Sequence, residues 1–169
     1  MKGKCCERRR RSRAQCLSAC TGVVDLVRID ENNYIQAFNL KLAKKQEQFV
    51  SNPIRSLAQV YVYYKQCIPF GIFNDNTMVG YVMVIYDYDL AEYNIWHMMI
   101  DIAYQHQGFG ELALRKCLDY IASKPFGQSN KVALMCNKDN SIALQLYYKF
   151  GFRKTGNDDE DEIELTLLL

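Results

Sequence analysis

The sequence predicts an α/β (α+β) fold in a single domain, and three observations support this class. The chain has 169 residues, which is long enough for one domain to bury a hydrophobic core. Short apolar runs typical of strands alternate with segments whose apolar residues recur at helical spacing. A glycine-containing turn, Gln105 to Gly110, lies between an apolar run over residues 95–100 and an amphipathic segment over residues 111–123.

The first part of the predicted domain is expected to hold one strand and two helices. Residues 23–29 alternate in hydrophobicity, as a half-buried strand does. Asp30 is a favourable N-cap for a helix that runs to about Gln46. Asn52-Pro53 begins a second helix, which runs to about Lys65, because proline is favoured at the first helical position.

A hairpin, a further strand and a long helix follow. Strands over residues 69–74 and 77–86 should pair around a turn at Asp75-Asn76. Residues 92–102 form the next strand, which leads through the glycine turn into a helix over residues 108–123.

The last part of the chain completes the alternation. Residues 131–136 read as a short buried strand, and a helix follows from Asn140 to Lys149. Gly151-Phe152 turns the chain into another short strand, and residues 162–168 close the sheet. Residues 158–161 are all acidic, so we expect them at a solvated hairpin tip.

Basic residues are concentrated at the start of the chain. Residues 1–22 hold seven basic side chains and one acidic one, a net charge of +6, so the whole-chain charge of +2 leaves −4 for residues 23–169. Because residues 1–22 lack hydrophobic periodicity, we expect them to be a disordered extension ahead of a single domain over residues 23–169. The extension could bind nucleic acid or act as an address, but charge runs are usually only solvated. The negatively charged domain should attract cations and not nucleic acid.

Hydropathy and cysteine usage indicate a soluble cytoplasmic protein. No apolar run approaches the roughly 20 residues that span a bilayer, and the basic start lacks the long apolar core of a signal peptide. The seven cysteines are odd in number and scattered, which favours reduced thiols over a disulfide framework. Neither the early cysteines nor His97 and His106 have the spacing of metal ligands, so we expect no metal.

Two motifs carry the chemistry. Residues 105–110 read Q-x-x-G-x-G, and not the G-x-G-x-x-G of dinucleotide-binding folds. Glycine lets backbone approach a phosphate closely, and a helix N-terminus presents free N–H groups to an anion, although such glycines also occur in plain turns. About thirty residues downstream, the segment from Asn140 to Phe152 reads N-x-x-A-x-x-L-Y-x-K-x-G-F.

Together these motifs resemble the GCN5-related N-acetyltransferase (GNAT) superfamily, whose phosphate loop is [R/Q]-x-x-G-x-[G/A] and whose next helix carries the second pattern. The resemblance implies the GNAT fold: a mixed central sheet of about six to seven strands, flanked by about four helices, with a splayed central strand pair that holds coenzyme A. Residues 46–50, 56–58, 69–70 and 78–81, with Trp96 and residues 99–101, are similar to the bacterial spermine/spermidine (diamine) N-acetyltransferase branch.

The resemblance implies acetyl-CoA as cosubstrate. Backbone N–H groups of residues 106–111 would hold its pyrophosphate, with Gln105 at the loop entrance, and the pantetheine arm would pair along the strand at residues 98–100. Asn140 would reach the cofactor, although asparagine there is also an ordinary N-cap. The residues assigned to the cofactor are therefore Met98, Met99, Ile100, Gln105, His106, Gln107, Gly108, Phe109, Gly110, Glu111 and Asn140.

Tyr147 matches the family tyrosine that acts as general acid and protonates the departing thiolate while an amine attacks directly. Its alternative role is that of an ordinary packing tyrosine on a helix that also carries Tyr148. Some polyamine acetyltransferases carry a glutamate base where this chain has Trp96, so that assignment does not transfer. Glu92 and Asp101 are the nearby carboxylates and His97 is a third candidate, while a structural or solvated role is the alternative for each.

The predicted acceptor is a small primary amine, with spermidine or spermine as first choice. Glu47, Glu92 and Asp101 are assigned to the acceptor, and Asp87 to Asp89 add acids and an aromatic ring that suit a polycation. Aminoglycosides, peptide N-termini and protein lysines stay open as acceptors. A non-catalytic sensor that binds CoA, and a nucleic-acid-binding protein that uses residues 1–22, are the alternatives of other classes. The sequence leaves a homodimer open.

Overall fold

A seven-stranded mixed sheet forms the centre of the protein, whose computed structural model describes residues 23–169. The strand order is β1-β2-β3-β4-β5-β7-β6, in which β4 and β5 run parallel and all other neighbours run antiparallel. The strands are β1 Val24–Arg28, β2 Cys67–Asn74, β3 Thr77–Asp87, β4 Glu92–Ile100, β5 Lys131–Asn137, β6 Arg153–Asp158 and β7 Glu162–Leu168. The prediction of a disordered extension falls on residues 1–22, outside the described residues.

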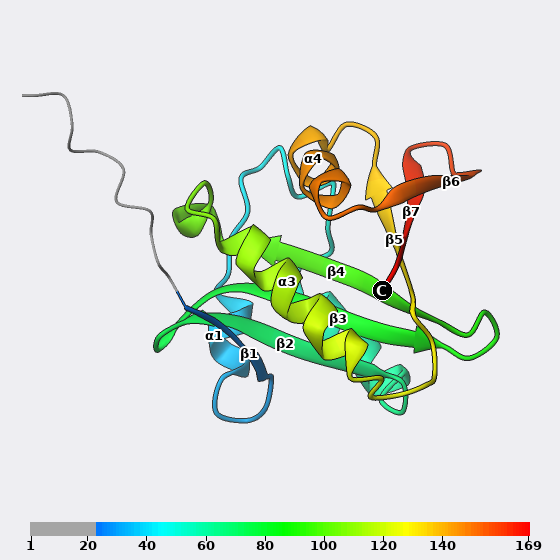
Figure 1. Ribbon diagram of the computed structural model, residues 1–169. Coiled ribbons are helices and arrows are strands. Elements are labelled where there is room, and N and C mark those ends of the chain that lie inside the picture. The colour runs from blue at the N-terminus through cyan, green and yellow to red at the C-terminus, as the bar shows by residue number, and fades with distance from the viewer. Residues whose placement is uncertain (1–22) are drawn as a thin grey trace, which may run out of the picture.

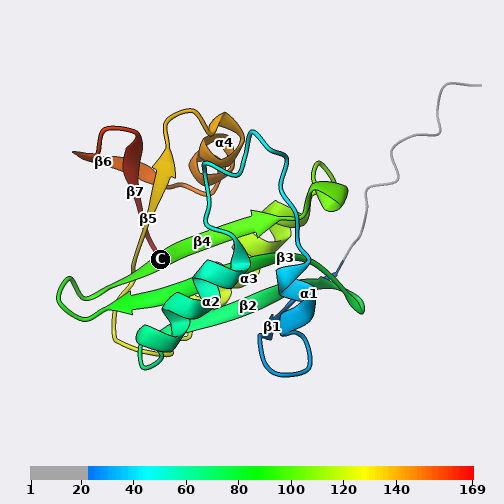
Figure 2. The same ribbon diagram turned by 180° about the vertical axis from the view of Figure 1, so that it is seen from behind.

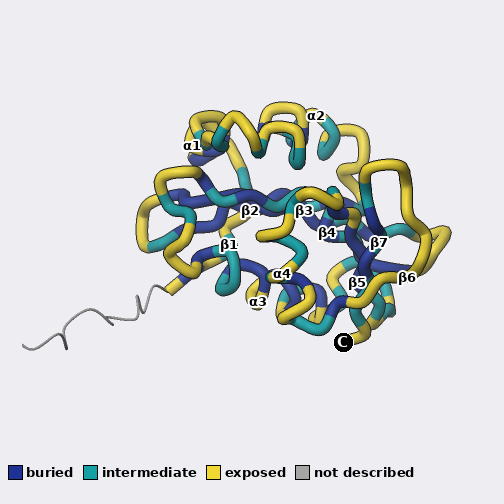
Figure 3. Tube along the Cα trace, turned by 90° about the horizontal axis from the view of Figure 1, so that it is seen from above, coloured by how far each residue is buried: buried dark blue, intermediate teal, exposed yellow. Residues whose placement is uncertain are grey.

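Helices cover both faces of this sheet, so the protein has three layers (Figures 1 and 3). The helices are α1 Tyr34–Phe38, α2 Pro53–Val62, α3 Phe109–Ala122 and α4 Ser141–Lys149, with a 3₁₀ turn, η1, at Ile102–Tyr104. Figure 2 shows α1 and α2 on the face opposite α3 and α4. Because both faces are covered, β2 and β3 are buried almost continuously, which explains their unbroken apolar runs.

Most of the predicted elements are present. The second helix begins as predicted, with Pro53 in its first turn and the Asn52 side chain accepting the Arg55 N–H, but it ends at Val62, three residues early. The hairpin pairs Asn74 with Thr77, and α3 starts and ends within a residue of its predicted bounds. The mixed sheet with four helices confirms the predicted fold class.

The predicted helix from Asp30 to Gln46 is wrong. Asp30 closes a turn by accepting the Asn32 N–H, and α1 lasts only five residues before the chain leaves the helix. The cause is a pair of distant hydrogen bonds at Lys41: its N–H donates to the Asp101 carboxylate (2.7 Å), and its C=O accepts from the Ile102 N–H (2.9 Å). These contacts replace helical bonds, so residues 39–52 form a long irregular connection to α2.

The two central strands, β4 and β5, separate soon after they meet. They pair only at Tyr93 with Val132 and at Asn94 with Ala133. Just beyond, β4 contains a bulge: Ile95 and His97 face consecutive residues of β3, and Trp96 is the extra residue between them. The predicted splayed strand pair is therefore present, and the edge of β4 from Trp96 onwards is open on the β5 side.

Candidate active site

A cleft of about 1050 Å³ occupies the space between the separating strands. It is lined by residues 94–100 of β4, residues 134–137 of β5 and residues 46–51 of the long connection. The glycine loop and the inner side of α4 complete it. The cleft thus brings together most of the predicted site residues: Glu47, Glu92, Met98, Met99, Ile100, Gln105, His106, Gly108, Phe109, Gly110, Glu111, Asn140 and Tyr147.

The glycine loop presents a row of free backbone N–H groups. Among the described residues, those of residues 106–110 donate to no backbone acceptor. His106 (φ 62°) and Gly108 (φ 85°) adopt left-handed conformations that turn the chain sharply into α3, and at Gly108 a side chain would be strained. The Glu111 N–H is not part of the row, because it donates to the Gly108 carbonyl (3.1 Å). The loop therefore has the geometry of an anion site over residues 106–110.

Two predicted loop residues use their side chains elsewhere. The Gln107 side chain is exposed, donates back to the Ala103 carbonyl and does not line the cleft. The Gln105 amide donates to the Ile100 carbonyl (2.9 Å) and exchanges two hydrogen bonds with Gln46. Gln105 lines the cleft, but its polar atoms already hold protein partners, so its side chain fixes the loop in place.

An ion pair joins the second sequence motif to Glu111, the residue that follows the first motif. Lys149, from the second motif, donates to the Glu111 carboxylate at the start of α3 (2.5 Å), and Arg115 lies 3.8 Å from the same carboxylate. These two cations offset the only acidic charge in the first turn of α3. The electrostatic attraction of this helix start for an anion is therefore preserved.

Tyr147 faces the cleft from α4. It is buried, its ring packs edge-on against Phe152, and it lines the cavity, whereas Tyr148 is partly exposed and does not. Burial, with smaller contributions from Cys136 and Cys117, raises the pKa of the Tyr147 phenol well above its usual value. The phenol is therefore protonated at neutral pH, as a proton donor must be.

Asn140 begins α4 as an N-cap, since its side-chain oxygen accepts the Ala143 N–H (3.3 Å). The capping role predicted from the sequence is thus confirmed. Asn140 also lines the cleft, at the end where residues 45–49 of the long connection approach the start of α4. The capping bond uses the oxygen and leaves the NH₂ group of the side chain for other acceptors.

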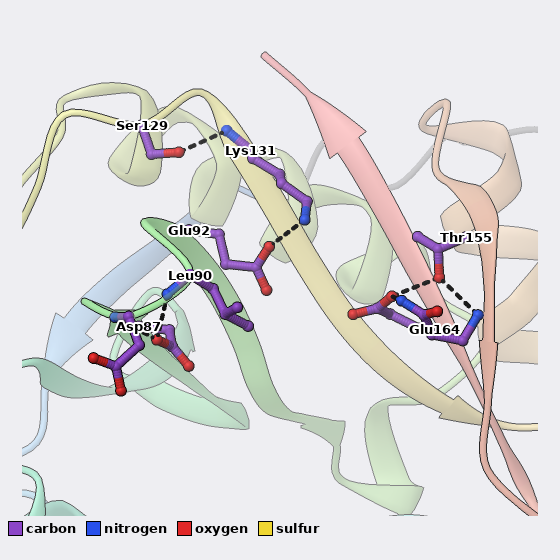
Figure 4. Close-up of polar contacts among 9 residues, drawn as sticks. Asp87, Leu90, Glu92, Ser129, Lys131, Thr155 and Glu164 are labelled. Atoms are coloured by element: carbon purple, nitrogen blue, oxygen red, sulfur yellow. Dashed lines mark hydrogen bonds and ion pairs between the residues drawn. The ribbon is translucent and has the colours of Figure 1, made fainter.

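The three carboxylates assigned to the acceptor have different surroundings. Glu47 is exposed on the cleft wall. Glu92 is 2% exposed, and Lys131 Nζ lies 2.5 Å from its Oε2 without hydrogen-bond geometry, across the short β4–β5 junction (Figure 4). It is therefore a buried, paired acid and not a solvated one.

The structure gives Asp101 contacts other than the acceptor contact predicted for it. Both of its oxygens accept backbone N–H groups, from Ala103 (2.8 Å) and Lys41 (2.7 Å), and the residue does not line the cleft. Asp101 caps η1 and holds the start of the long connection against the end of β4.

Aromatic side chains form the α2 side of the cleft. Trp96, at the bulge, stacks on His97 and meets the ring of Tyr63 edge-on (centroids 5.4 Å apart). His97 Nε2 lies 3.1 Å from the side-chain oxygen of Gln59, within hydrogen-bond distance. Burial, and to a lesser extent Arg55, lowers the pKa of His97 to about 4.

Acidic side chains predominate around the cleft. Of the described residues that line it, one, Arg55, has a permanent positive charge, and six have carboxylates: Glu47, Asp87, Glu92, Glu111, Glu162 and Glu164. Glu162 and Glu164 were missed by the sequence analysis. Their alternation with Ile163 and Leu165 does indicate one polar face of a strand, but only the placement of β7 beside β5 brings that face to the cleft.

Comparison with known proteins identifies the family. Residues 34–152, more than half of the chain, match the Acetyltransferase (GNAT) family. The chain therefore belongs to this family, and the predicted resemblance and enzyme class, an N-acetyltransferase, are confirmed.

Three similar proteins illustrate the range of the family. The spermine/spermidine N(1)-acetyltransferase of Bacillus subtilis (strain 168) is 24% identical over 144 residues, 80% of this chain and 91% of that protein. The N-alpha-acetyltransferase RimI of Mycobacterium tuberculosis is 32% identical over 104 residues, 60% of this chain and 59% of that protein. The fold is similar to the crystal structure of Vibrio cholerae spermidine N-acetyltransferase in complex with CoA and spermine (TM-score 0.71, 17% identity, 86% and 95% of the two chains).

Three further observations concern the remaining predictions. Between residues 23 and 169, no group of three or more histidine, cysteine, aspartate or glutamate side chains could hold a metal ion. In the same part of the chain, no helix is long and apolar enough to cross a membrane. The described cysteines, at positions 67, 117 and 136, are buried free thiols, and the other four lie outside the described residues.

The lowered pKa of His97 predicts a loss of stability in acid. The unfolded side chain takes up a proton near pH 6.5, whereas the folded one does so only near pH 4, so the free energy of unfolding should fall as the pH decreases through this interval. Urea unfolding at several pH values should show a shallower acid loss in His97→Gln than in the wild type. Parallel curves for the two proteins would contradict the pKa assigned to His97.

Proposed function

We propose that this N-acetyltransferase transfers the acetyl group of acetyl-CoA to a primary amine of a polyamine such as spermidine or spermine. The observation that carries the proposal is a single cleft that holds a row of free N–H groups, a protonated buried tyrosine and a predominantly acidic lining. The free N–H groups suit a phosphate-bearing cosubstrate, and the protonated tyrosine suits a thiolate leaving group. The acidic lining suits a polycationic acceptor.

The cleft fits acetyl-CoA, which supplies an acetyl thioester when bound. The N–H groups of residues 106–110 would hold the pyrophosphate, and the open edge of β4 at residues 98–100 would pair with the amides of the pantetheine arm. The free NH₂ group of Asn140 would donate to the cofactor from the other wall. The CoA present in the Vibrio cholerae structure is consistent with this assignment.

Tyr147 would act as general acid. The amine nitrogen forms a bond to the acetyl carbon, the carbon–sulfur bond breaks, and Tyr147 gives its phenolic proton to the departing sulfur. The attacking amine must be neutral, and its nitrogen loses a proton as the amide forms, which balances the proton that Tyr147 gives to sulfur. Asp101 is excluded as the base because both of its oxygens are bonded to backbone, and Glu92 is already paired with Lys131.

The lining of the cleft supports a polycationic acceptor. Glu47 is exposed on one wall, and Asp87 at the end of β3 and Glu162 and Glu164 of β7 also line the cleft. The rings of Tyr63 and Trp96 line the same cleft and offer cation–π contact. An amine with several positive charges uses such a surface better than a monoamine does.

A peptide N-terminus is the second candidate acceptor, because the RimI relative has the higher identity over its matched segment. That relative matches only 60% of this chain, and a single terminal amine needs fewer carboxylates than the cleft offers. A non-catalytic CoA sensor would not need a protonated tyrosine in the cleft. Turnover of acetyl-CoA measured with spermidine, a short peptide and an aminoglycoside would distinguish these acceptors from one another and an enzyme from a non-catalytic sensor.

Gly110→Val should weaken CoA binding at least about tenfold, because its methyl groups would enter the space in front of the free N–H row. The fold should survive, since a Cβ at Gly110 meets only Leu146 and Ile100, at 3.7 and 3.8 Å. Calorimetry with CoA measures the affinity, and thermal unfolding is the control. Unchanged affinity in the folded variant would remove the cofactor from this loop.

Tyr147→Phe should lower kcat on the order of a hundredfold with little change in acetyl-CoA affinity, since only the proton donor is lost. Tyr148→Phe is the matched control, because that ring lies outside the cleft. Steady-state kinetics with saturating acetyl-CoA give kcat. A near wild-type kcat in Tyr147→Phe would show that another group protonates the thiolate.

Glu47→Gln should raise the KM for spermidine about two- to fivefold, the range expected for one exposed charge pair, and the KM for a monoamine less. Added salt should raise the spermidine KM as well, because exposed charges are screened over about 10 Å at 0.1 M. Glu31→Gln, an exposed acid outside the cleft, is the control. Equal losses for both amines would favour a neutral or peptide acceptor.

A further inference from the structure

The long connection between α1 and α2 forms one wall of the cleft without regular structure of its own. Figure 2 shows this segment, in cyan, rising from α1 past β4 towards α4 and returning to α2. Residues 46–51 line the cleft, and Glu47 is among them. The position of this wall, called here the acceptor wall (residues 41–51), therefore determines where Glu47 lies.

Two sets of polar contacts attach the acceptor wall to the end of β4. The first is at its base, where the Lys41 N–H donates to the Asp101 carboxylate and the Lys41 C=O accepts the Ile102 N–H. The second is higher up, where the side chains of Gln46 and Gln105 meet. Leu42 and Val50 also pack against the buried cluster of Cys67, Tyr81, Met83 and Met99.

The second attachment is a reciprocal pair of amide hydrogen bonds, called here the glutamine clamp. Gln46 Nε2 donates to Gln105 Oε1 (3.1 Å), and Gln105 Nε2 donates to Gln46 Oε1 (3.0 Å). Gln105 is held in turn by the Ile100 carbonyl (2.9 Å), and Gln46 Oε1 also accepts the Ala43 N–H (3.2 Å). The clamp thus connects the end of β4 with a turn of the acceptor wall.

The clamp is continuous with the anion site. Gln105 directly precedes the row of free N–H groups over residues 106–110, and His106, the next residue, has a positive φ without being glycine. Without an anion, these N–H groups have no backbone acceptor, and the left-handed backbone at His106 is intrinsically unfavourable. A bound pyrophosphate would accept from the N–H groups and hold the backbone of Gln105 in this conformation.

We propose that the glutamine clamp transmits occupancy of the phosphate-binding loop to the acceptor wall, so that CoA bound at residues 106–110 orders residues 41–51. Gln46 and Gln105 are then positioning residues that couple the two substrate sites. The inference rests on the proposed cofactor site and is independent of which amine is the acceptor.

A consequence is cooperative binding of the two substrates. Because Glu47 directly follows Gln46, the amine site would be complete only once the cosubstrate is in place. Linkage requires the reverse effect as well: an amine that contacts the ordered wall should raise CoA affinity by the same factor. The coupling needs no large movement, since ordering of a flexible segment is sufficient.

Hydrogen–deuterium exchange of the full chain, with and without CoA, tests the proposal without any turnover. In the wild type, CoA should slow exchange of the backbone amides of residues 41–51 by about fivefold or more, the lower end of typical couplings. In Gln46→Met, which keeps the side-chain length but removes the clamp, the slowing should be less than about twofold. Gln48→Met is the matched control, because Gln48 lines the same wall without contributing to the clamp.

Exchange in the β2–β3 hairpin shows whether each variant is folded, and Gln105→Met removes the clamp from its other side should Gln46→Met be unstable. Loss of protection in both clamp variants, but not in Gln48→Met, supports the proposal. Protection that survives in either folded clamp variant overturns it, as does CoA binding to the wild type without protection of residues 41–51. A wild type that does not bind CoA in calorimetry overturns the proposed cofactor site together with this inference.

Discussion

The site depends on how briefly β4 and β5 pair. Two residue pairs join these parallel strands, and beyond them the bulge at Trp96 turns β4 away. In a continuous sheet, the backbone groups of β4 would be consumed by β5, and there would be neither a cleft nor an open strand edge. The ion pair between the buried Glu92 and the half-exposed Lys131 lies directly before the first of these two residue pairs. The separation of two strands of the sheet therefore creates the cleft, and the side chains that line it determine its chemistry.

Contacts between distant segments make the walls of this cleft act as a unit. Lys149 of α4 is bound to Glu111 of α3, and Gln46 of the long connection is bound to Gln105. The second sequence motif is thus joined to the start of α3 by an ion pair, while the acceptor wall is joined to the loop by neutral amides. The neutral pair has an advantage beside a site for a polyanion, because it adds no charge that would compete with the pyrophosphate.

Local signals made much of this architecture predictable. Asn52-Pro53 fixes the start of α2, and the glycine turn with its amphipathic continuation fixes α3, because caps and turns depend on neighbouring residues. The predicted helix to Gln46 failed for the opposite reason, since Asp101, sixty residues away, takes the Lys41 N–H. Separation along the chain also concealed the role of Asp101 itself and the pairing of Glu92 with Lys131. Residue roles that belong to a sequence motif could be predicted. Hydrogen-bond and ion-pair partners that are distant in the sequence could not.

The bulge also gives the protein a built-in optical reporter. The chain has a single tryptophan, and the fold places it at the bulge, on the wall of the cleft, stacked on His97. All indole emission of the protein therefore originates at the cleft of the candidate active site, and a molecule bound there that displaces water or brings a quenching group near Trp96 should alter that signal directly. Ligand occupancy can be followed in the unmodified protein, without label or coupled assay.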